Sequence, residues 1–438
     1  MIEKLRKHLA KILPNFSEKK FLLAISGGVD SVVMVELFAS LNLNFAVAHC
    51  NFQLRGVESD ADERLVSILA ARHQRPFFVK RFDTDLVAKQ SKESIQMVAR
   101  KLRYTWFAEL AECESFDYIV TAHHKNDLVE TMLLNLCKGT GYAGLVGIKV
   151  LNGNLLRPLL EFKKDDLLTY AQEHQLTWRE DASNSLDKYQ RNHLRLNVIP
   201  LLDKINPSAD DSFSRTSEKI NAAAGFIATQ IQLVKNQFVA EYEDYVEIDY
   251  TIKSLGNDLI FVMSEILRKY NFDFYKCKQI AEYNSDEPGA IFESETHQLL
   301  CDRKSYIIVA KNQIIEPLQT AFEQQIIEFG GNRFAIELQK VTDELLKDKN
   351  IVLVPEQYLG AELVLRNPIL GDEMAPFGMK GKRKKVADLL SDYKMPAILK
   401  PKVVVVEINK EIFSLLGIRA SEKTKVIDSE YVYVFKKI

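Results

Sequence analysis

The segment Ser26-Gly27-Gly28-Val29-Asp30-Ser31 contains residue types that together can hold a phosphate group. An apolar run over residues 21–25 predicts a buried strand before it, and residues 31–41 predict a helix after it. Backbone N–H groups converge at such a junction, and the helix dipole there favours an anion. The two glycines allow a tight turn, the two serine hydroxyls can donate hydrogen bonds, and Asp30 can bind Mg²⁺. We therefore predict a pyrophosphate site in this segment.

Polar residues also follow two other predicted strands. His49 begins a polar stretch after the apolar run 45–48, and residues 121–127 follow the run 118–121. Glu130 lies one helical turn beyond Asp127, so the two carboxylates share a helix face. Ligand sites in open α/β sheets lie at the carboxyl ends of the strands. We expect these side chains to border the same site as the phosphate segment.

The elements that must position these residues alternate between short apolar runs and helical patterns. This alternation is typical of a parallel α/β sheet with helices packed on it. The expected strands are 21–25, 45–48, 77–79 and 118–121, and the expected helices are 31–41, 59–73, 95–111 and 126–137.

The pattern changes after Pro200, and Asn206-Pro207 marks a boundary. We predict an α/β catalytic domain over 1–205, a mainly helical middle domain over 206–330 and a small α+β domain over 331–438. A long helix is expected over 208–240, and β-like runs occur at 403–406 and 431–434.

The phosphate segment resembles that of the PP-loop ATP pyrophosphatases. The resemblance implies an adenine nucleotide alpha hydrolase-like fold and cleavage of ATP to AMP and pyrophosphate, with AMP first transferred to a substrate oxygen. Further segments, in the same order, resemble the tRNA(Ile)-lysidine synthetase family: 49–56, 100–107, 121–127, 139–141, 157–159, 181–184 and 189–195. That family joins free L-lysine to C2 of the wobble cytidine in tRNA(Ile) with a CAU anticodon, using ATP and Mg²⁺. The resemblance is dense over the first two hundred residues and loose beyond them.

Chemical roles follow for the matched residues. Adenylation needs Mg²⁺ and positive charge on the phosphates, which suits Asp30 with Arg100 or Arg103. Lysine must be bound and deprotonated, and Asp127 and Glu130 are the candidates.

The remaining candidates are contacts with nucleotide and RNA. His49, His123 and His124 could contact the nucleotide or the base, and Arg191, Asn192 and Arg195 could meet phosphates of the anticodon arm.

Several of these residues have simpler interpretations. His123 and His124 with Asp127 could form a metal site, although no third ligand stands at a useful spacing. His49 could be a hydrogen-bonded residue at a strand end, and Arg191 with Arg195 could form a solvated helix face. The Asp127–Glu130 pair could be a helix-start feature that the dipole favours.

The C-terminal region contains a basic stretch, residues 380–385. Lys382, Arg383 and Lys384 suit contact with an RNA backbone, although a charge run is often a solvated loop. The chain departs from the family at Glu373, where the family often has Arg after Gly-Asp, and at Lys138, where Arg is common. C-terminal contacts could therefore differ in detail.

Composition limits the alternative functions. The five cysteines include no C-x-x-C pair, which argues against a zinc ribbon, a redox motif and the sulfur transfer of tRNA 2-thiolation enzymes. No amidotransferase unit is evident, and a non-catalytic nucleotide sensor would not need Asp127 or Glu130. The net charge of −2 means that any RNA surface is local. No signal peptide or membrane segment is evident, so we expect a cytoplasmic protein; the sequence leaves the oligomeric state open, a homodimer included.

Overall fold

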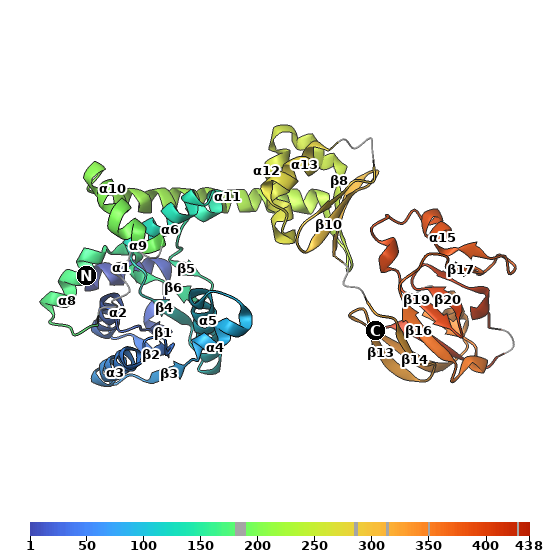
Figure 1. Cartoon of the computed structure of the whole chain (residues 1–438), viewed down its shortest axis with the longest axis horizontal. Helices are drawn as coiled ribbons and strands as arrows, with labels where there is room; N and C mark the ends of the chain where they lie inside the picture. The colour runs from blue at the N-terminus through green and yellow to red at the C-terminus, as the bar shows by residue number, and fades with distance from the viewer. Residues whose placement is uncertain (180–189, 284–287, 312–314, 349–350, 427–428) are drawn as a thin grey trace. The chain divides into compact units, whose positions relative to one another are not determined.

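The computed structural model describes the chain except for residues 180–189, 284–287, 312–314, 349–350 and 427–428 (Figure 1). It divides into two compact units, residues 1–227 and 228–438. Residues 181–184 and Tyr189, which contribute to the family resemblance, lie outside the described residues.

The first unit is built on a six-stranded sheet with the order β3-β2-β1-β4-β6-β5. Its strands are β1 Lys20–Ala24, β2 Asn44–Asn51, β3 Phe77–Arg81, β4 Tyr118–Thr121, β5 Leu151–Asn152 and β6 Leu155–Leu156. All neighbours pair in parallel except β5 and β6. The chain builds outward from β1 to β3 and then returns to place β4 on the other side of β1. This reversal of direction at β1 and β4 is the position where open α/β sheets bind ligands.

Helices cover both faces of this sheet, with α2 Val29–Ser40 on one side and α5 Ile95–Cys113 on the other. The further helices are α1 Ile2–Ile12, α3 Val57–Arg72, α4 Thr84–Ser91, α6 Lys125–Cys137, α7 Tyr142–Leu145, α8 Lys164–Glu173, α9 Gln190–His193, α10 Ile199–Ile205 and α11 Ala209–Phe238, the last of which continues into the second unit. Alternate residues of β1 point to opposite faces. Leu23 packs in the core that includes Val33 of α2, whereas Leu22 packs in the core that includes Phe107 of α5. The sheet is therefore buried on both sides, which explains why its strands are continuous apolar runs.

The four expected strands and four expected helices of this unit are confirmed, with ends shifted by a few residues. Helix α4 is an addition, and Thr84–Ser91 is shorter than the four helices that were expected. By its spacing Leu136 falls on the same helical face as the buried Leu128 and Met132, but it is 59% exposed. The packed face of α6 ends about one turn earlier than the pattern suggests.

The second unit contains three larger antiparallel sheets. The first has the order β7-β8-β11-β10-β9, the second β12-β16-β19-β20-β21 and the third β13-β14-β22-β15. The strands are β7 Val239–Glu241, β8 Val246–Asp249, β9 Ile291–Glu293, β10 His297–Cys301, β11 Ser305–Ala310, β12 Leu318–Ala321, β13 Gln325–Phe329, β14 Asn332–Lys340, β15 Ile351–Val354, β16 Glu362–Arg366, β19 Val405–Ile408, β20 Glu411–Leu415, β21 Arg419–Ala420 and β22 Tyr431–Lys437.

Helices α12 Leu259–Leu267 and α13 Phe274–Glu282 accompany the first sheet. The described part of the region 206–330 therefore contains the five strands of that sheet and also β12 and β13, besides the helices expected there. The remaining elements are the helices α14 Asp343–Lys347 and α15 Val386–Asp392 and the hairpin of β17 Glu373–Met374 with β18 Lys384–Lys385. The β-like runs 403–406 and 431–434 correspond to β19 and β22, which lie in two different sheets.

Candidate active site

The phosphate segment occupies the junction between β1 and α2, as expected. Gly27 has a φ of +95°, a backbone conformation that side chains other than that of glycine rarely adopt. The Ser31 hydroxyl donates to the Gly28 carbonyl at 2.8 Å and accepts from the Gly27 N–H at 3.2 Å. Ser26 Oγ lies 3.3 Å from Ser31 Oγ. The loop is therefore held by its own hydroxyl groups at the positively polarised start of a twelve-residue helix.

A cavity of about 640 Å³ lies beside this loop. Its walls come from the carboxyl ends of β1, β2 and β4, from the start of α3 and from one side of α5. Predicted site residues that line it are Ser26, Asp30, Ser31, His49, Arg103, His123 and Asp127. Residues from four separate segments of the sequence thus meet in one cavity, which is large enough for a nucleotide.

The start of α6 brings a second set of side chains to the phosphate loop. His124 Nε2 lies 3.8 Å from Asp30 Oδ2 and 3.5 Å from Asp127 Oδ2. The same Asp127 oxygen accepts a hydrogen bond from the His124 backbone N–H at 2.9 Å, which caps the helix. Lys164, at the start of α8, places Nζ 2.7 Å from Asp30 Oδ1. Asp30 therefore lies close both to the Lys164 ammonium group, which neutralises its charge, and to the His124 imidazole, which also faces Asp127.

Glu130 lies one turn further along α6 and is fully buried. Arg195 Nε donates to Glu130 Oε1 at 2.7 Å, and Arg195 Nη2 lies 3.9 Å from Asp127 Oδ1. Glu130 Oε2 has no hydrogen-bond partner in the described structure. Arg195 belongs to a π-helical turn, Leu194–Val198, and such turns are frequent at functional sites. One guanidinium therefore contacts both carboxylates of the predicted pair.

The two carboxyl groups differ in their proton affinity. Burial raises the pKa of Glu130, although Arg195 opposes the effect. Burial acts in the same direction on Asp127, but His124, His123, the His124 amide and Arg195 together lower the pKa of Asp127 below its ordinary value. Neighbouring acids with divergent pKa values are suited to different tasks, one as a permanent anion and one as a proton acceptor.

Two histidines of the cavity are held neutral. His49 Nδ1 donates to the Ile25 carbonyl at 2.8 Å, and burial lowers the pKa of His49. The side chain is thus both a hydrogen-bonded strand residue and part of the cavity wall. His123 Nδ1 lies 2.9 Å from Thr121 Oγ1, and burial lowers the pKa of His123 to about 4.

The predicted arginine residues differ in their position relative to the cavity. Arg103 lines the cavity and lies over the Phe52 ring, 5.2 Å from its centroid. Arg100 is exposed on the same helix and lies over Tyr104, whose side chain lines the cavity. Arg191 donates to Thr131 Oγ1 on α6 at 3.1 Å, and Asn192 is buried.

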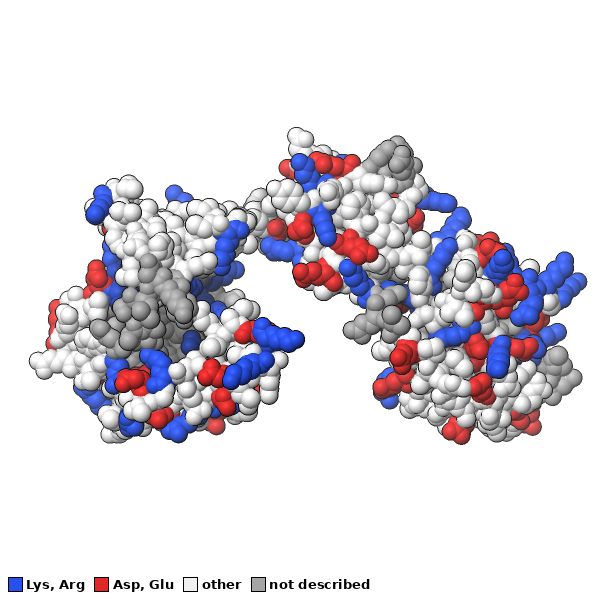
Figure 2. Space-filling view, in the orientation of Figure 1, with Lys and Arg blue, Asp and Glu red and all other residues white. Residues whose placement is uncertain are grey.

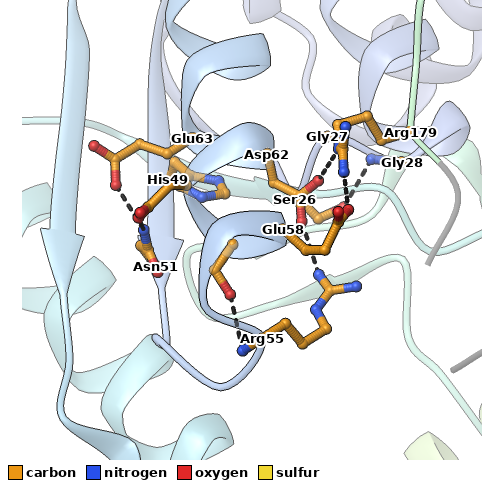
Figure 3. A network of polar contacts seen from close by, with 12 residues as sticks. Ser26, Gly27, Gly28, His49, Asn51, Arg55, Glu58, Asp62, Glu63 and Arg179 are labelled. Atoms are coloured by element: carbon orange, nitrogen blue, oxygen red, sulfur yellow. Dashed lines mark hydrogen bonds and ion pairs between the residues drawn. The ribbon is translucent and has the colours of Figure 1, made fainter. Parts of the chain in front are cut away.

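Sequence reasoning missed a group of charged residues beside the phosphate loop. Asp62, on α3, accepts hydrogen bonds from Arg55 Nη2 and from Arg179 Nε, each at 2.7 Å (Figure 3). Arg179 also pairs with Glu58, and its backbone N–H donates to the Gly27 carbonyl at 3.1 Å. Arg179 has no local motif that predicts this role, because it reaches the loop from 152 residues further along the chain (179 − 27). Lys164 was missed for the same reason.

Comparisons with known proteins agree with this geometry. A PP-loop domain model matches residues 1–202, and a TilS substrate binding domain model matches residues 246–311. The tRNA(Ile)-lysidine synthase of Parabacteroides distasonis is 33% identical over 98% of this chain and 98% of its own length. The chain belongs to the tRNA(Ile)-lysidine synthase family. Two further relatives with that name come from Bacteroides thetaiotaomicron, at 32% identity over 96% of each chain, and Chlorobaculum tepidum, at 41% over 50% of this chain and 70% of the relative.

Membership of the tRNA(Ile)-lysidine synthase family confirms the resemblance seen in the sequence and identifies an ATP-dependent ligase. It does not favour the alternative of tRNA thiolation. Cys50 lines the cavity, but burial raises the pKa of its thiol to about 12, so it is a poor nucleophile at neutral pH. A cysteine that carries sulfur would need a thiol pKa below its ordinary value.

The glycine-rich pattern that follows α6 does not form a nucleotide-binding site. Residues 139–144 read Gly-Thr-Gly-Tyr-Ala-Gly, which matches GxGxxG. The segment follows helix α6 and leads into the short helix α7, whereas a dinucleotide site needs a strand before the glycines. In this member of the lysidine synthase family the pattern forms a helix–helix connection.

The described residues also limit other site types. No group of three or more His, Cys, Asp or Glu side chains among them is arranged to hold a metal ion, so the interpretation of His123, His124 and Asp127 as a metal site gains no support. Over the same residues, no helix is both long and apolar enough to cross a membrane. Lysine and arginine are mixed with acidic side chains on the face in Figure 2, in line with a net charge of −2.

The basic stretch of the second unit lies in the loop of the β17–β18 hairpin. Lys382 and Arg383 are exposed, whereas Lys384 pairs with Asp392. At the departure from the family pattern, Arg366 makes a bidentate contact with Asp372 at 2.8 and 2.9 Å, and Glu373 is exposed. The Asp372 carboxylate is therefore paired with an arginine inside the fold, and the carboxylate of the neighbouring Glu373 is exposed on the surface.

Proposed function

We propose that this chain joins free lysine to C2 of the wobble cytidine of tRNA(Ile) with a CAU anticodon. The reaction uses an adenylated cytidine intermediate and converts ATP to AMP and pyrophosphate. The observation that carries the proposal is the meeting of the phosphate loop with the Asp127–Glu130 pair, through His124, at one end of the sheet. Both halves of the reaction, the activation of an oxygen and the delivery of an amine, need neighbouring sites of this kind.

In the first half-reaction, the cytidine O2 attacks the α-phosphorus and pyrophosphate leaves. Backbone N–H groups at the start of α2 and the hydroxyls of Ser26 and Ser31 can bind phosphate oxygens. Asp30 would hold Mg²⁺, since Mg²⁺ needs only one or two carboxylates beside phosphate oxygens. Mg²⁺, when bound, neutralises charge that develops on the phosphates. Lys164 and Arg103 can add positive charge there.

In the second half-reaction, the lysine ε-amine attacks C2, and AMP leaves with the former O2. The ε-ammonium must first be bound and then lose a proton. Asp127, with its lowered pKa, suits the binding of the cation. Glu130, with its raised pKa and an oxygen without a partner, suits acceptance of the proton. Arg195 keeps the two carboxyl groups in position.

The tRNA contacts are proposed for exposed cations near the cavity and in the second unit. Arg191 and the exposed Arg100 are placed to meet phosphates, and Lys382 and Arg383 can do so from the hairpin loop. For Arg195 and Asn192 a positioning role in the first unit is better supported than direct contact, since Arg195 pairs with Glu130 and Asn192 is buried. Because the substrates are tRNA, ATP and free lysine, we propose a cytoplasmic location.

The test is incorporation of radiolabelled lysine into a tRNA(Ile) transcript with a CAU anticodon. We expect incorporation only with both ATP and Mg²⁺, and none into a matched transcript whose wobble cytidine is replaced by uridine. Labelled sulfide or cysteine in place of lysine should leave the tRNA unlabelled. Folded protein that catalyses ATP–pyrophosphate exchange with the CAU transcript but incorporates no lysine would contradict the assignment of lysine as nucleophile.

A further inference from the structure

Arg157, directly after β6, is a buried cation that the steps above do not use. It is 8% exposed, and its Nη1 donates to the Lys149 carbonyl at 2.7 Å. In the described part of the chain its Nε has no hydrogen-bond partner and no carboxylate pairs with it. A buried charge without a counter-ion costs free energy, so an anion that binds nearby would be stabilised by this guanidinium.

A second buried arginine, Arg366 of the second unit, is neutralised within the fold. Its side chain is 12% exposed and contacts Asp372 at 2.8 Å and Glu407 at 2.6 Å. Burial lowers the pKa of Arg366, but the two carboxylates outweigh burial and raise that pKa above its ordinary value. At Arg157 burial also lowers the pKa, and a hydroxyl, that of Tyr104, opposes the effect without reversing it. The fold thus supplies a counter-ion to one buried arginine and not to the other.

Two further arginines lie near Arg157, at the border of the cavity. Arg100 of α5 is exposed and lies over the Tyr104 ring, 4.9 Å from its centroid. Arg191 of α9 is exposed as well. Burial does most to lower the pKa of His123, and the positive charges of the three arginines lower it further. All three therefore lie around one side chain that lines the cavity.

Two other cations near the cavity are already paired with carboxylates. Lys164 contacts Asp30, and Arg195 contacts Glu130. The three arginines around His123 instead contact a carbonyl, a hydroxyl and an aromatic ring, and none of them pairs with a carboxylate within the described ranges. Positive charge at this border is thus available to an anion.

The wobble cytidine would bring an anion to this border. Its C2 must reach the Asp127–Glu130 pair, so the ribose and the phosphates attached to it extend outwards from the site. Contacts between arginine and backbone phosphates set the position of a nucleic acid. The exposure of Arg100 and Arg191 suits a backbone that remains in solvent.

We infer that Arg100, Arg157 and Arg191 form a binding site for a backbone phosphate of the anticodon loop next to the wobble cytidine. Arg100 and Arg191 contact the phosphate, and Arg157 acts through its charge from the buried side, where salt screens it less. The inference deepens the proposed function and rests on it for the identity of the RNA.

The test compares binding of natural and modified tRNA(Ile) transcripts to the full chain by fluorescence anisotropy. One uncharged methylphosphonate replaces the phosphate on the 5′ or on the 3′ side of the wobble cytidine. The wild type should bind one of the two modified transcripts about tenfold more weakly than the natural transcript, because a charged contact is lost. Arg100→Gln and Arg191→Gln should bind the natural transcript more weakly than the wild type and should lose little further affinity for that modified transcript.

Arg157→Gln should also bind the natural transcript about three- to tenfold more weakly, and the slope of log Kd against log salt concentration should fall by about one. Arg157→Lys keeps the charge and should restore much of the affinity. The control is Arg72→Gln, which should bind as the wild type does. Arg72 is 61% exposed and ends α3, at the edge of the sheet opposite the cavity.

Equal binding of the natural and both modified transcripts by the wild type would overturn the inference, whether or not Arg157→Gln folds. Unchanged affinity and salt dependence in a folded Arg157→Gln protein would do the same. A higher KM for lysine with unchanged tRNA affinity would assign the charge to the carboxylate of lysine and also overturn it. A wild type that shows the phosphate effect but incorporates no lysine would break the proposed function and leave this site intact.

Discussion

The junctions β1–α2 and β4–α6 occupy equivalent places on neighbouring strands of one sheet, yet they supply opposite chemistry. At β1–α2 the loop contains Gly27, with its φ of +95°, and Gly28, and the backbone N–H groups of the first turn of α2 follow directly. At β4–α6 the loop contains His123 and His124, and it offers side chains that lead to two carboxylates. The first junction suits an anion and the second suits a cation.

The difference follows from which groups each loop leaves accessible to a ligand. Without Cβ atoms, the glycines let a ligand approach the amide groups at the start of α2, where the helix dipole is favourable. At the start of α6 the Asp127 carboxylate already accepts the His124 N–H, so the helix end is capped by the protein itself. A helix start that the protein itself caps is a poorer site for an external phosphate. The carboxylates near this end can instead bind an ammonium group. A matching pair of junctions can thus bring ATP and an amine together.

Replacement of Asp30 should give the largest effect at the first junction. Asp30→Ala removes the proposed Mg²⁺ ligand and leaves Lys164 without its 2.7 Å contact. We expect tRNA-dependent ATP–pyrophosphate exchange to fall about a hundredfold or more. Asp165→Ala, which removes an exposed carboxylate from α8, is the control and should retain exchange. Comparable exchange in both variants would show that Asp30 is not needed for adenylation.

At the second junction, Glu130→Gln should separate the two half-reactions. The substitution keeps the shape of the side chain but removes the negative charge that faces Arg195 and, in our proposal, lysine. We expect the kcat of lysine incorporation to fall about a hundredfold while exchange changes little, because the proposed proton acceptor is lost. Steady-state kinetics at varied lysine concentration provides the measurement. A fall in exchange with an unchanged kcat for lysine incorporation would contradict the assignment of Glu130 to the second half-reaction.

The backbone of the first junction can be tested by a matched pair of glycine variants. Gly27→Ala forces a side chain into a positive φ and should lower the free energy of unfolding by about 1–3 kcal/mol. Gly28 has a φ of −74°, and an added Cβ would meet only Ser26 Oγ at 3.6 Å, so Gly28→Ala should cost well under 1 kcal/mol. The chain's two tryptophans, Trp106 and Trp178, both lie in the first unit, so their fluorescence during urea unfolding reports this unit. Equal costs would mean that the loop relaxes around Gly27.

The smallest effect is expected from the pH dependence of the second junction. The pKa of His123 is about 4 in the folded chain, against an ordinary value of 6.5. Between these values the unfolded chain binds a proton that the folded chain does not, so this contribution to stability is complete above about pH 6.5 and is lost as the pH falls towards 4. His123→Gln should therefore flatten the loss of stability over this range by at most about 1 kcal/mol per pH unit. Tryptophan fluorescence during urea unfolding at pH 7.5 and 5.5 would measure it, and an identical slope in both proteins would contradict the shift.

Much of the catalytic unit could be predicted because its signals are local. The phosphate segment, the strands on either side of it and the spacing of Asp127 and Glu130 are properties of short stretches of sequence. Helix α4 and the five-stranded sheet after α11 were not anticipated, because their elements are short. Leu136 shows the limit of periodicity, since an apolar pattern does not reveal where the packed neighbour ends.

The sequence by itself determined the phosphate loop, the alternation of strands and helices, and the carboxylate pair. Only the tertiary structure decided which distant cations join them. Lys164 reaches Asp30, Arg195 reaches Glu130 and Arg179 reaches Gly27 from positions 134, 65 and 152 residues away. The physical reason is the order of the sheet: placing β4 beside β1 brings the following segments back over the same edge, and no local pattern encodes that return.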